Sequence, residues 1–266
     1  MHSTEGQAMT HTHINFQTAP GHQVMAAAGK KILRPGGRAA TEQLFQWAGF
    51  QPGETVLELA SSFGYSAIAL AQRYGVRVVG VERDPESVAR ARANIKAAGL
   101  EGQVEVIEGN IFNLEHIPGQ FDYVLAEAIL TMQSQPGKAK ILQGICDRLK
   151  PGGHFLSHEM QVQGREDEIR KALAETIRTN ATPLSETNWM EAYETAGLHV
   201  VQHKAGPMGL LDPAQIVRDE GWADTVKFFW NALTQKTIRD RLLAMRNVFK
   251  QYQQELGYIV LYAERH

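Results

Sequence analysis

The residues between Val56 and Asp84 have the types and spacing that an adenosine cofactor requires. An apolar stretch containing Glu58 leads into a turn of small residues, and a second apolar stretch ends at Glu82. In an α/β fold, a turn of small residues after one strand lets a ligand approach the backbone. An acid after the next strand accepts hydrogen bonds from ribose hydroxyls. The stretch therefore predicts an adenosine-cofactor site built on two successive strands.

The elements that must position this turn are short apolar strands separated by helices. Strands are expected at residues 55–59, 76–81, 104–107, 121–126, 154–157, 198–203 and 258–262. Helices are expected at residues 40–47, 66–74, 85–98, 138–149, 166–179 and 186–195, with Lys150-Pro151-Gly152-Gly153 as a turn. Strands that alternate with helices are joined by crossovers, so they form a mainly parallel sheet covered on both faces.

Composition limits the classes of protein. The chain has 266 residues, 43% of them hydrophobic, and a net charge of −2 without a basic block, so we expect no nucleic-acid partner. No apolar run approaches the ~20 residues of a membrane span, and residues 1–25 do not resemble a secretory signal. The single cysteine, Cys146, cannot form an internal disulfide. We expect a cytoplasmic protein without a membrane partner.

Two segments stand apart from the alternating pattern. Residues 1–35 form a polar N-terminal arm, which is either a disordered lead or a lid that covers the site, with Phe16 as an apolar plug. Residues 206–256 are a mostly helical insertion before the last strand. An apolar stripe runs along its last helix, and an aromatic group precedes it (Ile238, Leu242, Met245, Phe249, Tyr252 and Leu256; Trp222, Phe228, Phe229 and Trp230). The stripe packs on its own domain, closes over the substrate as a lid or pocket wall, or forms a homodimer contact.

Five short motifs, in order along the chain, resemble those of class I S-adenosylmethionine-dependent methyltransferases that act on small molecules. They are residues 56–64, residues 81–84, Gly109-Asn110-Ile111, residues 121–125 and residues 149–153. The resemblance covers residues 36–205 and 257–266 as the cofactor-binding domain. It implies an α/β, doubly wound, mainly parallel, seven-stranded Rossmann-like sheet, with the last strand antiparallel and the helical insertion before it.

The resemblance also implies S-adenosylmethionine as the cofactor and assigns residues to it. Glu58 would lie near the amino-acid end of the cofactor, Glu82 would accept both ribose hydroxyls, and Ile111 would pack on the adenine. The full set comprises Glu58, Ala60, Ser61, Ser62, Gly64, Glu82, Arg83, Asn110 and Ile111. The sequence departs from the family in having Ala60 and Ser62 at two of three usual glycine positions, and Asn110 in place of an aspartate. The small residues still permit close approach, and an asparagine carbonyl still accepts a hydrogen bond from the adenine amino group.

NAD is the rival cofactor. Its pyrophosphate requires a G-x-G-x-x-G loop at a helix start, whereas the loop here reads Ala60-Ser61-Ser62-Phe63-Gly64-Tyr65. The missing glycines favour a cofactor without phosphate. A protein that binds S-adenosylmethionine without catalysis, as a sensor or scaffold, is the second alternative.

Residues that could act on a methyl acceptor follow two strands that are expected to be neighbours. Glu127 follows residues 121–126, and His158 and Glu159 follow residues 154–157, so all three would lie at the carboxyl edge of the sheet. We expect His158 or Glu127 to orient or deprotonate an acceptor hydroxyl or amine. A rim histidine with solvent-facing acids is the alternative. The spacing does not indicate a Mg²⁺ or Ca²⁺ site, so no metal is predicted. The expected function is methyl transfer to O, N, S or C of a small organic acceptor.

Overall fold

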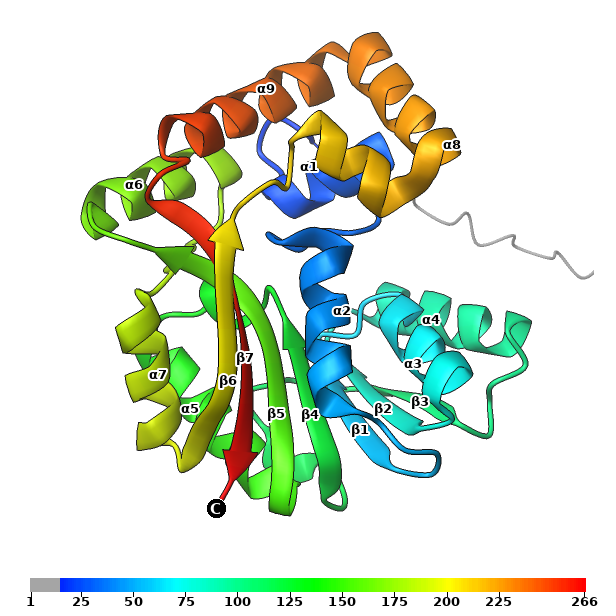
Figure 1. The fold of residues 1–266 in the computed structure, drawn as a ribbon. Coiled ribbons are helices and arrows are strands. Elements are labelled where there is room, and N and C mark those ends of the chain that lie inside the picture. Colours follow the sequence, from blue (N-terminus) through cyan, green and yellow to red (C-terminus); the bar gives the residue numbers. More distant parts are fainter. Residues whose placement is uncertain (1–14) are drawn as a thin grey trace, which may run out of the picture.

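The structure, a computed structural model, describes residues 15–266, and within that range the chain forms one seven-stranded sheet. The strand order is β3-β2-β1-β4-β5-β7-β6, and only β7 runs antiparallel to its neighbours (Figure 1). The strands are β1 (Thr55–Leu59), β2 (Arg77–Glu82), β3 (Val104–Glu108), β4 (Phe121–Glu127), β5 (Leu149–Val162), β6 (Leu198–Pro207) and β7 (Leu256–Arg265). The predicted mainly parallel sheet with an antiparallel last strand is confirmed.

Helices cover both faces of the sheet and its carboxyl edge. They are α1 (Gly21–Ala28), α2 (Gly37–Ala48), α3 (Tyr65–Tyr74), α4 (Pro85–Ala97), α5 (Gln135–Arg148), α6 (Glu166–Ile177), α7 (Glu186–Thr195), α8 (Pro213–Thr234) and α9 (Lys236–Gln251), with short 3-10 turns at Leu114–His116 and Leu130–Met132. One apolar core joins α2, α3 and α4 to one face, and a second joins α5 and α7 to the other. The strands therefore place the loops at their carboxyl ends between two rigid layers.

Helix α4 starts where the sequence places it, immediately after the end of β2. Asp84 caps it by accepting a hydrogen bond from the Ser87 N–H at 2.8 Å, and Pro85 occupies the first turn. The cap fixes the chain directly beyond Glu82, so the carboxylate that ends β2 is held at the rim of the site.

The strand expected at residues 154–157 is much longer. In the structure β5 runs from Leu149 to Val162, and the residues predicted as a Lys-Pro-Gly-Gly turn lie within it. Leu149 pairs with Phe121, and the register then shifts before Tyr123 pairs with His154. This irregularity absorbs the extra residues, with Gly152 in the left-handed region at φ 70°. Turn chemistry in the sequence thus marks a bulge inside a strand.

A helical cap lies over the carboxyl edge of the sheet, at the top of Figure 1. Helices α1, α6, α8 and α9 share a third apolar core, so part of the N-terminal arm packs with the insertion. The α9 stripe, Ile238, Leu242, Met245, Phe249 and Tyr252, is buried in this core, and Leu256 at the start of β7 is buried beside it. Its side chains therefore pack on their own chain. Residues 1–14, with the arm histidines His2, His11 and His13, lie outside the described residues.

Within residues 15–266, no helix has both the length and the apolarity needed to cross a bilayer.

Candidate functional site

The loop after β1 has the backbone conformation that three alternating glycines give in the methyltransferases it resembles. Ala60, Ser62 and Gly64 all have positive φ, at 53°, 49° and 76°. A residue with a Cβ pays roughly 1–2 kcal/mol for this region, so Ala60 and Ser62 keep the loop shape at a cost. Ser61 folds over Gly80 on β2, where an added Cβ would lie 2.6 Å from the serine Oγ. Gly80 therefore lets the loop close, and the sequence analysis did not identify it.

The carboxylate of Glu82 faces this loop. Its Oε2 accepts a hydrogen bond from the Ser62 N–H at 2.9 Å, and its Oε1 accepts from the N–H groups of Arg83 and Asp84 at 2.8 and 2.9 Å. A carboxylate has about four lone-pair sites, so Glu82 can accept further hydrogen bonds from a diol. Arg83 contributes to this arrangement through its backbone N–H.

Glu58 is buried beneath the loop, and its Oε2 has no hydrogen-bond partner among the described residues. Burial raises the pKa of Glu58 from 4.5 to about 8, and the nearby Glu127 charge adds to the rise. Arg34 and the Ser66 hydroxyl act in the opposite direction. A buried carboxyl oxygen without a partner is costly, so this position is suited to a cationic or hydrogen-bond-donating ligand group.

Asn110 and Ile111 follow β3, next to the end of β2. The Asn110 Oδ1 accepts a hydrogen bond from the Phe112 N–H at 3.0 Å, which shapes the turn. One lone pair of this oxygen and the Asn110 amide remain available, because Asn110 is exposed. Ile111 is half-buried against the core, so its side chain provides an apolar surface at the same edge.

Arg34, which the sequence analysis missed, enters the site from the segment before α2. Its Nη2 lies 2.7 Å from Glu127 Oε2, and the guanidinium also donates to the hydroxyls of Ser66 and Thr41. Thr41 on α2 donates to Glu127 Oε1 at 2.5 Å. Arg34 thus links the N-terminal segment, the end of β4 and the start of α3.

His158 is fully buried and neutral. Its Nε2 accepts a hydrogen bond from the Gly36 N–H at 2.9 Å, so the proton lies on Nδ1, which is 3.3 Å from the Thr41 hydroxyl. Burial lowers the pKa of His158 to about 3, and the Arg34 charge lowers it further. His158 lies 3.9 Å from Glu127 and reaches its carboxylate through Thr41. His158 and Glu127 are therefore close to each other, as predicted. Both ring nitrogens of His158 already face partners, the Gly36 N–H and the Thr41 hydroxyl.

Glu159 points to the opposite face of the sheet because neighbouring residues of a strand alternate. It accepts hydrogen bonds from the N–H groups of Leu130 and Thr131 and from the Thr131 hydroxyl, at 2.6 to 3.0 Å. Burial raises its pKa to about 7, against the effect of these bonds. Glu159 therefore anchors the turn after β4. The prediction that it lies together with Glu127 and His158 is wrong.

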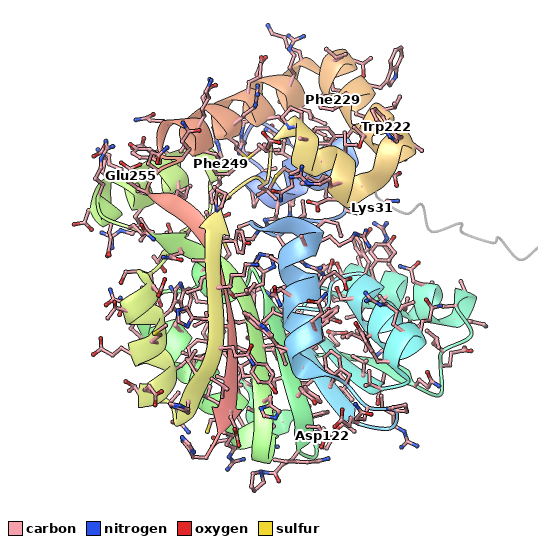
Figure 2. All side chains as sticks on the ribbon, in the orientation of Figure 1. Lys31, Asp122, Trp222, Phe229, Phe249 and Glu255 are labelled. Atoms are coloured by element: carbon pink, nitrogen blue, oxygen red, sulfur yellow. The ribbon has the colours of Figure 1, made fainter. Side chains whose placement is uncertain are left out.

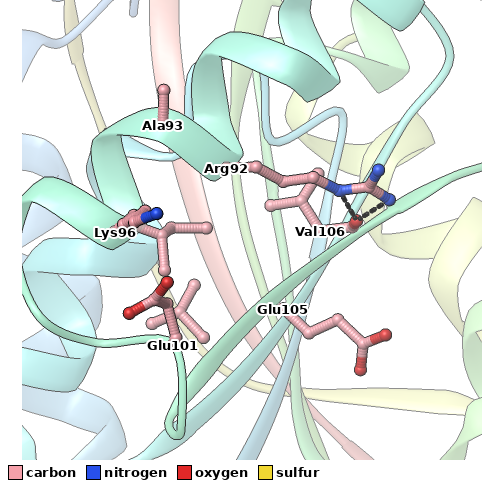
Figure 3. A pocket seen from close by; sticks show the side chains of 8 residues that line it. Arg92, Ala93, Lys96, Glu101, Glu105 and Val106 are labelled. Atoms are coloured by element: carbon pink, nitrogen blue, oxygen red, sulfur yellow. Dashed lines mark hydrogen bonds between the residues drawn. The ribbon is translucent and has the colours of Figure 1, made fainter.

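No group of three or more His, Cys, Asp or Glu side chains in residues 15–266 is arranged to hold a metal ion. A hollow of about 650 Å³ lies elsewhere, between α4 and the amino-terminal half of the edge strand β3 (Figure 3). Arg92 lines it, but its guanidinium is already bonded to the Val106 carbonyl. Asp122 lies at the other end of the sheet, where it accepts hydrogen bonds from Thr55 and pairs with Lys150 (Figure 2).

Three residues of the network had weak signals in the sequence. Arg34 directly precedes a Pro-Gly-Gly turn that leads into a helix, and Thr41 lies one helical turn along that helix. Thr131 lies four residues after the end of β4, which is close enough to suggest a contact with the neighbouring strand β5. The contacts of Arg34 and Thr41 with Glu127 and His158 were hidden by their distance in sequence, whereas Thr131 contacts Glu159.

Comparisons with known proteins agree with this geometry. A family model described as a methyltransferase domain matches residues 50–216. An uncharacterized protein of Haemophilus influenzae is 33% identical over 246 residues, which cover 92% of this chain and 98% of that protein. A solved SAM-dependent methyltransferase from Thiobacillus denitrificans, in complex with S-adenosyl-L-homocysteine, has a TM-score of 0.66 at 18% identity and covers 92% of this chain and 98% of its own. Geranyl diphosphate methyltransferase, in complex with GPP and sinefungin, has a TM-score of 0.64 at 14% identity and covers 86% and 77%.

Proposed function

The chain belongs to the methyltransferase domain family and is an S-adenosylmethionine-dependent enzyme, and from this premise we propose that it methylates a small organic molecule. The observation that carries the cofactor-binding part of the proposal is the buried Glu58 carboxyl, whose Oε2 has no partner among the described residues, near the ion pair of Arg34 with Glu127. A structural neighbour with this fold holds GPP, a small molecule.

The residues present fit the cofactor. The unpaired Oε2 of Glu58 would receive the ammonium of its amino-acid end, while Arg34 and the uncapped start of α3 would receive its carboxylate. Glu82 would hold the ribose, and Asn110 with Ile111 would hold the adenine. When bound, the cofactor supplies an activated methyl group with a neutral thioether as the leaving group.

The chain contributes alignment and a shaped electrostatic environment. Holding two reactants in line is worth roughly 7–11 kcal/mol, so a strong base is not required. Glu127 is the favoured residue to orient an acceptor hydroxyl or amine, because its carboxylate lies at the carboxyl end of β4 beside Arg34. His158 is better suited to position Thr41, and through it Glu127, than to accept a proton, because the Gly36 N–H already occupies Nε2.

Incubation with cofactor labelled in its methyl group and a metabolite extract tests the proposal. We expect a labelled product of low molecular mass, and less of it with the Glu82→Ala variant at the same subsaturating cofactor concentration. A protein that saturates with cofactor but forms no product would act as a binder only. Label in the nucleic-acid or protein fraction of a whole lysate would contradict the small acceptor.

A further inference from the structure

The second half of α8 presents an apolar face to solvent. Trp222, Val226, Trp230 and Leu233 are 76%, 64%, 67% and 67% exposed, and Phe229 is 39% exposed. Their spacing of three and four residues places them on one side of the helix, and we name these five residues the α8 face. Figure 2 shows Trp222 and Phe229 on this helix, with Lys31 beside it. An apolar cluster of this size is unusual on the surface of a soluble monomer and marks an interaction site.

The α8 face is not a badly packed part of the core. Thr225 and Phe228, on the other side of the same helix, are buried, and Phe228 belongs to the cap core. Gly221 breaks α8 at φ 78° and ψ 170°, so the segment from Trp222 onward takes a direction of its own. The fold therefore buries one side of this segment and leaves its aromatic side outward.

The segment that carries the α8 face, together with the helix that follows it, is rich in basic residues. Residues 222–251 contain six Lys or Arg and two Asp, a net charge of +4, whereas the whole chain carries −2. Three of the basic residues, Arg239, Arg246 and Lys250, share one side of α9 with Leu243, which is 47% exposed. Both acids lie close to a basic residue: Asp224 is paired with Lys31 at 2.7 Å, and Asp240 lies 3.5 Å from Arg239.

We propose that the α8 face docks on an anionic lipid surface. Tryptophan and leucine on one side of a helix, with Lys and Arg beside them, are the composition of helices that lie in the bilayer interface. Anionic headgroups attract basic side chains within about one Debye length of the surface. A second copy of the chain fits less well, since a twofold contact would bring two basic rims together. From the sequence alone no membrane partner was predicted, because only the fold reveals that the apolar side chains of the α8 face are exposed.

The docking surface is independent of methyl transfer and is tested by lipid binding. Cosedimentation uses vesicles of phosphatidylcholine with or without phosphatidylglycerol, and tryptophan emission is recorded on the same samples. We expect binding to the anionic vesicles with a blue shift in emission, and a several-fold loss of binding when salt rises to about 0.5 M. Binding that is equal on the neutral vesicles would overturn the proposal.

Two variants complete the test. Trp222→Ala with Trp230→Ala should weaken binding about tenfold or more, because two interfacial anchors are lost. Val201→Ser is the matched control, since Val201 is 46% exposed on β6 and lies outside the α8 face, and it should bind like the parent. Circular dichroism should show the parental melting temperature in both. An equal loss in both variants overturns the proposal. So does light scattering that finds a dimer abolished by the tryptophan changes, without vesicle binding.

Discussion

Cofactor binding should release a proton from Glu58, and the Glu58→Gln variant should abolish the release. The carboxyl is buried, one of its oxygens is unpartnered, and its pKa is raised to about 8. At pH 7 the group is therefore mainly protonated in the free protein. An ammonium placed beside it favours the ionised form and lowers its pKa, so the proton must leave on binding.

The size of the effect follows from the pKa. A group with a pKa of about 8 is roughly 90% protonated at pH 7, so binding should release up to about 0.9 proton per cofactor. The rise from 4.5 to about 8 corresponds to roughly 5 kcal/mol of cost for ionising the free protein. Because the folded-state pKa is raised, this group favours folding below about pH 4.5, and that contribution is lost as pH rises to about 8. Cofactor affinity should increase over the same range.

Calorimetry measures the release. S-adenosyl-L-homocysteine, which carries the same amino-acid end, is titrated at pH 7 in phosphate and in Tris, whose ionisation enthalpies differ. The change in apparent enthalpy gives the protons released. Glu58→Gln should reduce it to near zero, and Glu105→Gln, at an exposed acid on β3, should leave it unchanged. Tight binding by the parent with no proton release would refute the reasoning, and so would equal release in parent and Glu58→Gln.

Four other changes test the rest of the site. Glu82→Ala should weaken cofactor binding by about 10- to 100-fold in calorimetry, because charged hydrogen bonds are worth roughly 1.5–3 kcal/mol, and unchanged affinity would remove Glu82 from the ribose site. Ser62→Gly should raise the melting temperature by a few degrees, because a left-handed residue with a Cβ costs about 1 kcal/mol, and a lower value would contradict the strain. Glu127→Gln should lower kcat more than cofactor affinity. His158→Gln should do so less strongly, and parental turnover in both would exclude this network from catalysis.

The cofactor half of the site was accessible from the sequence because it follows strand ends. Strands buried on both faces are continuous apolar runs, and the residue after each run must lie at the carboxyl edge of a parallel sheet. Glu82 and Asn110 stand at or just beyond the ends of such runs, whereas Glu58 lies within β1 and was assigned to the cofactor by the family resemblance. The β5 boundary was not, because Gly152 and Gly153 in a bulge have the composition of a turn.

The part of the candidate site around Glu127 and His158 was harder to predict from the sequence, because it depends on the direction in which each side chain points. A one-residue difference along β5 separates His158, next to Thr41, from Glu159, next to Thr131. Strand alternation could have predicted that separation, but no local pattern indicated that Arg34 would reach Glu127. The exposure of the α8 face was equally hidden, since an apolar stripe on α9 is buried while one on α8 is not.

Residues 30–38, which lead into α2, contact both the helical cap and the candidate site. At one end, the buried Lys30 lies 3.3 Å from Glu220, and Asp219 accepts a hydrogen bond from the Arg38 N–H. Gly37, at φ 65°, has no room for a Cβ because Asp219 would lie 2.5 Å away. Between these anchors, the same segment brings Arg34 to Glu127 and the Gly36 N–H to His158. One short segment therefore connects α8 to the residues that contact Glu127 and His158.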